Sequence, residues 1–209
     1  MRYAISDIHG CPKTFQLLLQ TIDFSQDDEL YLLGDYVDRG PDSLGVINHI
    51  RKLQDEGHTV HCLRGNHEQM LLDAWRQNNV PWDFDAPETD KRWLLPWLEQ
   101  LAYYFEIDDY ILVHAGLNFH HHYPLKDTHA MLWERGWYDR LDRQWLGRRI
   151  IVHGHTPEPV ISVRRGIDEM ALAQRVCIDS GCAMRVGGMG YLTALNLDTR
   201  VGVDVRKVD

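Results

Sequence analysis

Five short blocks along the chain carry side chains of the kinds that bind divalent cations and phosphate. In chain order they are Asp7-Ile8-His9-Gly10, Gly34-Asp35-Tyr36-Val37-Asp38-Arg39-Gly40, Gly65-Asn66-His67-Glu68, His114-Ala115-Gly116 and Gly154-His155-Thr156. Carboxylate, imidazole and amide oxygen suit a pair of hard or borderline cations. Two cations about 3.5–4 Å apart can promote attack of water on a phosphate ester. The blocks therefore predict two-metal phosphoester chemistry.

The spacing of these residues indicates how two cations could be shared. Asp7 and His9 are two residues apart at the end of an extended run, so both side chains point the same way and can reach one cation. Asp35 follows the next such run and can bridge both cations. Three more side chains can complete the second site: Asn66, His114 and His155. His153 also flanks Gly154, so the residue types alone leave the choice of histidine open.

Alternating strands and helices are predicted to position the first three blocks. Residues 2–6, 29–33 and 59–63 read as strands, with helices beginning near Pro12 and Pro41 between them. This β-α-β-α-β order predicts a mostly parallel sheet covered by helices. Each block follows the carboxyl end of a strand, which is the edge where open α/β sheets bind ligands.

The rest of the chain predicts helices and then more strands. Residues 67–102 read as mainly helical, and we expect the tryptophans there to serve core or cap packing rather than a substrate groove: Trp75, Trp82, Trp93 and Trp97. Residues 105–107 and 110–113 read as a hairpin and 150–152 as a strand. The last strands, at 175–178, 191–197 and 201–205, read as antiparallel, and this late run suggests a second sheet packed on the first.

Composition narrows the classes of partner. The formal net charge of −9 disfavours nucleic acid and an anionic membrane surface as partners. The four cysteines form no C-x-x-C pair, which is typical of reduced thiols in a cytoplasmic protein. We expect no signal peptide before the first block and no membrane span, since no apolar run is long enough for one.

Taken together, the blocks resemble those of the PPP-type phosphoprotein phosphatases in the calcineurin-like metallophosphoesterase superfamily, especially the small bacterial and bacteriophage lambda protein phosphatases. The resemblance extends to Gly65-Asn66-His67-Glu68-Gln69-Met70, Leu132-Trp133-Glu134-Arg135, Gly154-His155-Thr156-Pro157 and Ile178-Asp179-Ser180-Gly181. It is weakest at 71–102. It implies one α/β domain over 1–209, a β-sandwich of two sheets flanked by helices with a dimetal site at the strand ends, and residues 70–102 as a helical insertion or cap.

The resemblance also implies a set of metal ligands. It places the first metal on Asp7, His9 and Asp35, and the second on Asp35, Asn66, His114 and His155. The expected cofactor is two divalent ions, with manganese as the best choice and iron or zinc as alternatives. A hydroxide bridging them would attack phosphorus directly, without a covalent phosphoenzyme.

Other side chains are given roles around the phosphate by the same resemblance. Arg39 would bind phosphate oxygens, and His67, oriented by Asp38, would protonate the leaving oxygen. Arg135 is expected as a second phosphate-binding residue, with a surface arginine as the alternative. Arg64 could contact phosphate or serve a structural role.

Two details of the last metal block refine the resemblance. The family's ligand is the histidine after glycine, which selects His155 over His153. Nucleases and phosphodiesterases of the superfamily often place another histidine two residues later. Pro157 stands there in this chain, which disfavours those activities.

Two features outside the blocks have simple structural explanations. The run His120-His121-His122 is expected in a solvated loop, with a rim contacting substrate or a stray metal as the alternative. Cys11 is expected to be a small buried packing residue rather than a redox control.

The function expected from the sequence is that of a cytoplasmic serine/threonine protein phosphatase acting on a phosphorylated protein or peptide, with phosphotyrosine as an open possibility. The alternative is a symmetrical diadenosine tetraphosphate hydrolase; Glu68 and the intact Asp38-Arg39 pair favour the phosphatase. A non-catalytic phosphoprotein-binding module is disfavoured because all six ligand positions are filled. The sequence does not set the oligomeric state, and a monomer is compatible with it.

Overall fold

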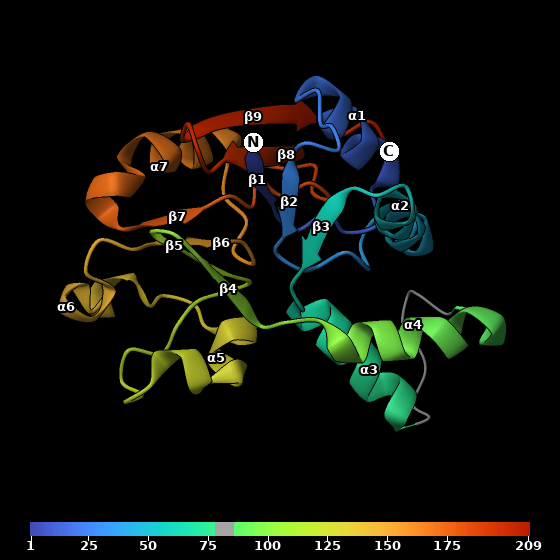
Figure 1. Cartoon of the computed structure of the whole chain (residues 1–209), viewed down its shortest axis with the longest axis horizontal. Coiled ribbons are helices and arrows are strands. Elements are labelled where there is room, and N and C mark those ends of the chain that lie inside the picture. The colour runs from blue at the N-terminus through green and yellow to red at the C-terminus, as the bar shows by residue number, and fades with distance from the viewer. Residues whose placement is uncertain (78–85) are drawn as a thin grey trace.

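Two β-sheets packed face to face, with helices on their outer sides, form the protein (Figure 1). The computed structural model describes residues 1–77 and 86–209. The α/β sandwich of two sheets flanked by helices predicted from the sequence is thereby confirmed.

The first sheet contains five strands: β1 (Arg2–Ile5), β2 (Glu29–Leu32), β3 (Thr59–Cys62), β8 (Tyr191–Asn196) and β9 (Val201–Arg206). Their order is β3-β2-β1-β8-β9. β1, β2 and β3 are parallel, whereas β8 runs antiparallel to β1 and to β9. The parallel half therefore sends three strand ends to one edge.

The second sheet contains four strands: β4 (Tyr104–Ile107), β5 (Tyr110–Val113), β6 (Ile150–His153) and β7 (Arg175–Cys177). β4 and β5 form the expected hairpin, and β5, β6 and β7 are parallel. The expectation that residues 175–178 form an antiparallel strand is wrong, because β7 pairs in parallel with β6. A helix between β6 and β7 supplies the crossover that a parallel pair requires.

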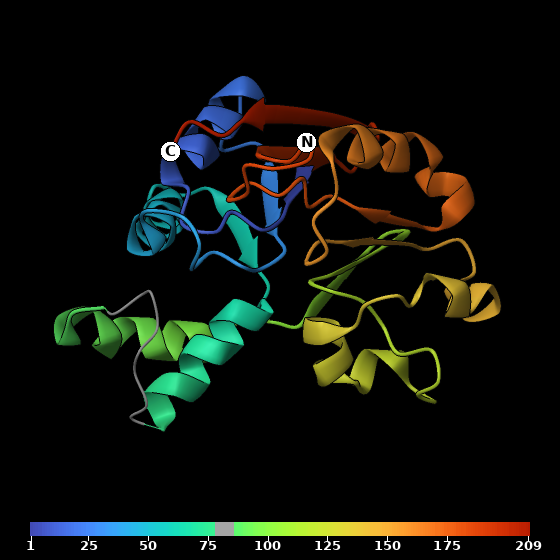
Figure 2. The same cartoon turned by 180° about the vertical axis from the view of Figure 1, so that it is seen from behind.

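Seven α-helices are described in residues 1–77 and 86–209: α1 (Pro12–Thr21), α2 (Ser43–Asp55), α3 (Asn66–Arg76), α4 (Glu88–Gln100), α5 (Thr128–Trp133), α6 (Arg143–Leu146) and α7 (Val160–Ala173). Short 3-10 turns lie at η1 (Pro124–Lys126) and η2 (Tyr138–Arg140). Figure 2 shows α3 and α4 as a pair at the lower left of the molecule, below the sheets, and α5 and α6 at the lower right. None of the helices in the described ranges is both long and apolar enough to cross a bilayer.

Strand alternation builds three apolar layers. Ile5 and Leu32 point toward α1 and α2, whereas Ala4 points into the space between the sheets. Leu112 of β5 lies in that central layer, and Ile111 faces the outer layer near α6. Since neighbouring side chains of a strand point to opposite faces, each short strand contributes to two cores at once.

Helix α7 has no counterpart among the elements expected from the sequence. Its buried residues Val163, Ile167 and Met170 follow helical spacing and join the layer between the sheets. That spacing is the signal by which the helix could have been found.

The segment proposed as a helical insertion or cap contains most of α3 and all of α4. Trp75, Trp93 and Trp97 are partly buried and pack against the core formed with α1 and α2. Trp82 lies outside the described residues. The assignment of 1–209 as one domain with this segment as a cap stays a proposal.

Candidate active site

The carboxyl ends of the parallel strands of both sheets converge on one cluster of polar side chains. Asp7 and Asp35 follow β1 and β2, and Asn66 begins α3 directly after β3. His114 and His155 follow β5 and β6 of the other sheet. Asp7, Asp35, Asn66, His114 and His155 are each less than 10% exposed. Residues up to 148 positions apart in the chain thus share one buried site.

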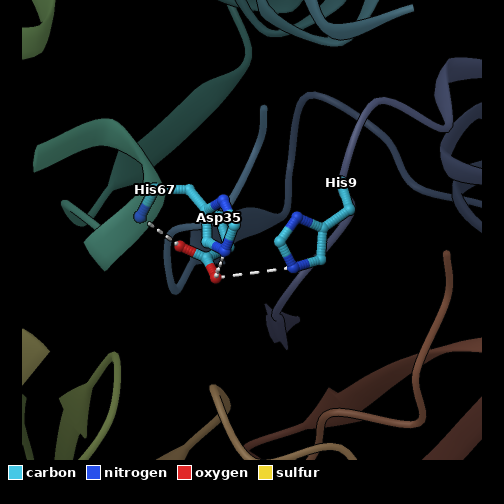
Figure 3. A group of neighbouring side chains, drawn as sticks. All are labelled: His9, Asp35 and His67. Atoms are coloured by element: carbon cyan, nitrogen blue, oxygen red, sulfur yellow. Dashed lines mark hydrogen bonds and ion pairs between the residues drawn. The ribbon is translucent and has the colours of Figure 1, made fainter. Parts of the chain in front are cut away.

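Asp35 lies at the centre of the first half of this cluster. Its Oδ2 is 3.4 Å from His9 Nε2 and 3.9 Å from His67 Nε2. Figure 3 shows dashed lines from the rings of His9 and His67 to this same carboxylate oxygen. Asp7 Oδ1 is 4.0 Å from His9 Nε2. The sequence-predicted residues Asp7, His9 and Asp35 are therefore brought together.

The other carboxylate oxygen of Asp35 faces the second half. Asp35 Oδ1 is 3.5 Å from His114 Nε2. Asn66 Oδ1 lies 2.9 Å from His114 Nε2 and 2.8 Å from His155 Nδ1. One carboxylate thus lies between two groups of donors, which is the arrangement that the proposed bridging role requires.

The donor atoms fit divalent cations. His9 Nδ1 bonds to the carbonyl oxygen of Val37 at 2.8 Å, and His114 Nδ1 to that of Leu33 at 2.8 Å. Such backbone bonds fix the ring and direct the other nitrogen inward. Buried His9 Nε2 and His155 Nε2 have no hydrogen-bond partner in the described structure. Buried nitrogens without a partner are costly unless another group, such as a metal ion, satisfies them.

The ionisation of these groups is consistent with cation binding. Burial, together with the Arg39 charge, holds the pKa of His9 well below its usual range. Burial also lowers the pKa of His155 to about 2, with His114 adding to the effect. Burial and the neighbouring Asp7 carboxylate raise the pKa of Asp35 well above its usual range. Neutral imidazoles keep a lone pair for a cation, and a cation would relieve the crowding of carboxylates.

Asp38, Arg39 and His67 form a second set beside the metal-ligand candidates. His67 Nδ1 is 2.6 Å from Asp38 Oδ2, and Arg39 Nη2 is 3.2 Å from His67 Nε2. Burial lowers the pKa of His67, but the bond to Asp38 and the charge of Asp35 outweigh it, so the net shift is upward. Arg39 itself is exposed. An imidazole held by a carboxylate and an exposed guanidinium thus face the same space.

Arg135 and His153 differ in their relation to this site. Arg135 Nη1 lies 3.3 Å from Thr156 Oγ1, next to His155 in the chain. His153 turns away: its Nε2 lies 2.8 Å from the Tyr138 hydroxyl, and burial lowers its pKa to about 4. His155, not His153, is therefore the histidine of this block that joins the cluster.

Arg64 connects helices instead of facing the cluster. Its Nη1 donates to Gln69 Oε1 and to the Tyr103 hydroxyl, both at 2.9 Å. Its Nη2 donates to the carbonyl oxygens of Leu98 and Glu99. These bonds tie the start of α3 to the end of α4, so the geometry favours the structural role.

Backbone strain is concentrated in the candidate residues. Six of the ten non-glycine residues with positive φ in the described chain belong to the predicted site: Asp7, His9, Asp35, Asp38, Arg39 and His155. This left-handed conformation is uncommon for such residues and costs of order 1–3 kcal/mol each. The surrounding packing must hold these turns in place.

Glu68 is one of the groups that hold the turns. Its carboxylate accepts hydrogen bonds from the backbone N–H of Asp35, Tyr36 and Gly65, each at 2.8 Å. It is fully buried. Glu68 therefore locks the second block to the third.

Close backbone approach explains two motif glycines. A Cβ on Gly154 would lie 2.0 Å from Asp7 Oδ2, and one on Gly65 would lie 2.2 Å from Asp35 Oδ1. The backbone N–H of His155 also donates to Asp7 Oδ2 at 3.0 Å. Blocks far apart in the chain thus fit together only where a side chain is missing.

Asp179 is a buried carboxylate at this edge to which the sequence analysis gave no role. It follows β7, and its Oδ1 accepts a hydrogen bond from Gly181 N at 2.9 Å. Burial and the nearby Asp7 raise its pKa well above the usual range. Its place after a strand, in the segment Ile178-Asp179-Ser180-Gly181, was the available signal.

Comparison with known proteins identifies the fold family of this site. Residues 3–188 match the family described as calcineurin-like phosphoesterase. The chain belongs to the calcineurin-like phosphoesterase family. It is therefore a metallophosphoesterase-type hydrolase, a family that uses divalent metal ions.

Curated relatives share one described activity. Proteins named symmetrical bis(5'-nucleosyl)-tetraphosphatase from Nitrosospira multiformis and Nitrosomonas europaea are 37% and 38% identical over 123 and 121 residues. A protein of the same name from Pseudomonas putida is 35% identical over 125 residues. Each match covers 55% of this chain and 42–44% of the relative. The chain thus matches less than half the length of these relatives.

Solved structures share the fold at low identity. A candidate diadenosine tetraphosphatase is 23% identical with a TM-score of 0.68, over 100% of this chain and 94% of that one. A serine/threonine protein phosphatase from Saccharomyces cerevisiae is 16% identical with a TM-score of 0.70, over 100% and 80%. At these identities the likeness shows the fold alone.

The expectation of a serine/threonine protein phosphatase with a phosphoprotein substrate is wrong, because the sequence relatives are named as dinucleoside tetraphosphatases. The physical reason is that the residues expected to distinguish a protein phosphatase from a tetraphosphate hydrolase have structural roles common to both. Glu68 binds backbone N–H groups, and Asp38 and Arg39 both contact His67. These contacts assemble the centre whichever phosphate substrate enters, so they carry no information about it.

Proposed function

We propose that this chain is a symmetrical dinucleoside tetraphosphate hydrolase that splits diadenosine tetraphosphate into two ADP. The observation that carries the proposal is the shared name of relatives 35–38% identical to more than half of the chain. The buried donor cluster supports it, since hydrolysis of a polyphosphate requires neutralisation of several phosphate charges.

We propose the following division of the metal ligands. Asp7, His9 and Asp35 would hold one cation, and Asp35, Asn66, His114 and His155 would hold the other. Manganese is our choice for both, because the donor set mixes carboxylate, amide oxygen and imidazole. Bound cations would supply Lewis-acid activation of water and would neutralise charge on the attacked phosphate.

The remaining residues bind phosphate and handle a proton. Arg39 and Arg135 bind phosphate oxygens, for which a planar guanidinium is well suited. Asp38 holds His67 through Nδ1 at 2.6 Å. In the structure Arg39 contacts His67 Nε2. A phosphate that binds Arg39 would take over this guanidinium, and His67 Nε2 would then face the leaving oxygen. His67 then gives its proton to that oxygen.

The test is product analysis with manganese-loaded protein. Equal concentrations of diadenosine tetraphosphate and of a phosphoserine/phosphothreonine peptide pool are compared by nucleotide chromatography and phosphate release. We expect rapid formation of ADP as the nucleotide product, with slow phosphate release from peptides. Formation of ATP plus AMP, or strong preference for the peptides, would contradict the proposal.

A further inference from the structure

A groove lined by basic residues leads away from Arg39. One cavity, of about 380 Å³, is lined by Arg39, Arg185, Lys207 and Asp209 among others. An adjoining cavity, of about 320 Å³, shares Arg185, Lys207 and Asp209 and adds Arg206. We call this continuous surface the basic groove and define it by its cations: Arg39, Arg185, Arg206 and Lys207. Both volumes reach the range of small-molecule sites, roughly 300–1,000 Å³.

The charges of the basic groove are available to a ligand. Within the described residues, none of its four cations lies within 4.0 Å of a carboxylate, whereas exposed Arg164 pairs with Asp204 at 2.7 Å. Asp209 is the acid lining both cavities, and its carboxylate is already engaged. Its two oxygens accept hydrogen bonds from the backbone N–H of Lys13 and Thr14 at the start of α1, at 3.1 and 2.8 Å. A local excess of positive charge results in a chain of net charge −9.

Hydrogen bonds fix the segments that carry these cations. Lys207 N donates to the carbonyl oxygen of Gly190 at 2.9 Å. The next residue, Val208, donates its N–H to Thr14 Oγ1 at 3.0 Å. The turn that carries Arg185 is closed by the bond from Gly190 N to the carbonyl oxygen of Gly181, at 3.0 Å. The backbone beneath both cations is therefore set before a ligand arrives.

The chemistry of symmetrical cleavage defines what must lie beside Arg39. Hydrolysis of the bridging bond between the second and third phosphates produces one nucleoside diphosphate from each side of that bond. Each half carries its own anionic phosphates, and a small phosphate monoester has no such extension. The phosphates of one half must therefore be bound by cationic side chains other than those that bind the reacting phosphate.

We propose that the basic groove binds the nucleoside diphosphate half that extends past Arg39, with Lys207 and Arg185 contacting its phosphates. This inference rests on the proposed function and adds to it two specificity-determining residues. By holding the distal phosphates, the basic groove sets which phosphorus reaches the cluster around Asp35. Substrate affinity, rather than the chemical step, is what these two cations serve.

The test compares two substrates in the variants Arg185→Ala, Lys207→Ala and the double variant. In the double variant we expect the KM for diadenosine tetraphosphate to rise about tenfold, with kcat nearly unchanged. The kcat/KM for p-nitrophenyl phosphate, which has no distal phosphate, should stay the same. Arg148→Ala is the control, because Arg148 is 88% exposed, pairs only with Asp109 at 3.6 Å among the described residues, and lies before β6, away from the carboxyl ends of the strands. An unchanged KM, or equal losses for both substrates, would overturn the inference.

A binding measurement separates failure of this inference from failure of the proposed function. If the wild-type protein releases no ADP from the tetraphosphate, the proposed function is wrong. Titration calorimetry then measures the affinity for ADP, which tests binding at the basic groove independently of catalysis. About tenfold weaker ADP binding in the double variant would support a nucleoside diphosphate site there. Equal ADP affinity in wild type and double variant would refute it.

Discussion

Asp35 is the residue on which the candidate centre depends most. Its two oxygens face different histidines, at 3.4 Å for His9 and 3.5 Å for His114. Its place could be predicted from the sequence, because an aspartate directly after a strand must lie at the carboxyl edge of the sheet. The role of His67 follows from its partners, because Asp38 holds the ring through Nδ1 while Nε2 lies next to Arg39.

A change of His67 should reveal how much the reaction needs a proton donor. His67→Asn should slow hydrolysis of an alkyl phosphate on the order of 10²-fold, since the alkoxide leaving group needs a proton. Diadenosine tetraphosphate should be slowed much less, because its leaving group is a phosphate that is already stable as an anion near neutral pH. Steady-state kinetics on both substrates, with metal content measured alongside, provide the check. Equal slowing of the two would argue against a general acid at this position.

At the scale of elements, the candidate site depends on how closely the loops after the strands approach one another. Gly154, after β6, lies against Asp7, after β1. These strands belong to different sheets, so the contact joins the two halves of the sandwich at the edge that carries the ligand candidates.

Addition of one methyl group should test that contact. Gly154→Ala would place a Cβ 2.0 Å from Asp7 Oδ2, so we expect loss of bound metal and of activity together. Gly166→Ala is the matched control: its Cβ would lie 3.6 Å from Val176, an ordinary contact, within α7. The control should keep full activity and gain about 0.5–1 kcal/mol of stability. Metal analysis and thermal unfolding measure both effects, and full metal content in Gly154→Ala would contradict the proposed packing role.

Local sequence patterns predicted most helices and strands, whereas they did not predict how distant strands pair. The run at 29–33 became β2 with nearly the same bounds, because apolar alternation and flanking turns are encoded nearby. The parallel direction of β7 follows from helix α7, which connects it to β6, and the prediction failed because that helix was not among the expected elements. The prediction of the substrate class failed for a related reason. The motifs describe the reacting centre, while the cations we assign to substrate recognition, Arg185 and Lys207, lie outside every motif.

At the scale of the whole molecule, metal binding and stability should be linked. The described candidate centre buries Asp7, Asp35 and Asp179 together, and burial with mutual repulsion raises the pKa of Asp35 and of Asp179. Without metal, these two carboxyls favour the folded state when protonated and lose that contribution as pH rises through their folded pKa values. A bound cation removes this cost, because it favours the ionised form.

Removal of metal should therefore lower the Tm, and by more at higher pH. We expect chelation to produce a larger fall in Tm at pH 8 than at pH 5.5, since protons compete with metal for Asp35 at the lower pH. Calorimetric scans of metal-loaded and chelated protein at the two pH values provide the measurement. A difference in Tm that is the same at both pH values would show that no carboxyl of raised pKa takes part in metal binding.

The position of β1 in the middle of the first sheet has a consequence for synthesis on the ribosome. Among the described strands β1 is made before the others, yet one of its two neighbours, β8, begins at Tyr191. At about 5–20 residues per second, roughly 10–40 s separate the two. During that time β1 carries an unpaired edge, open to wrong partners. This edge of β1 becomes protected only when β8 has been synthesised and pairs with residues Tyr3 to Ile5.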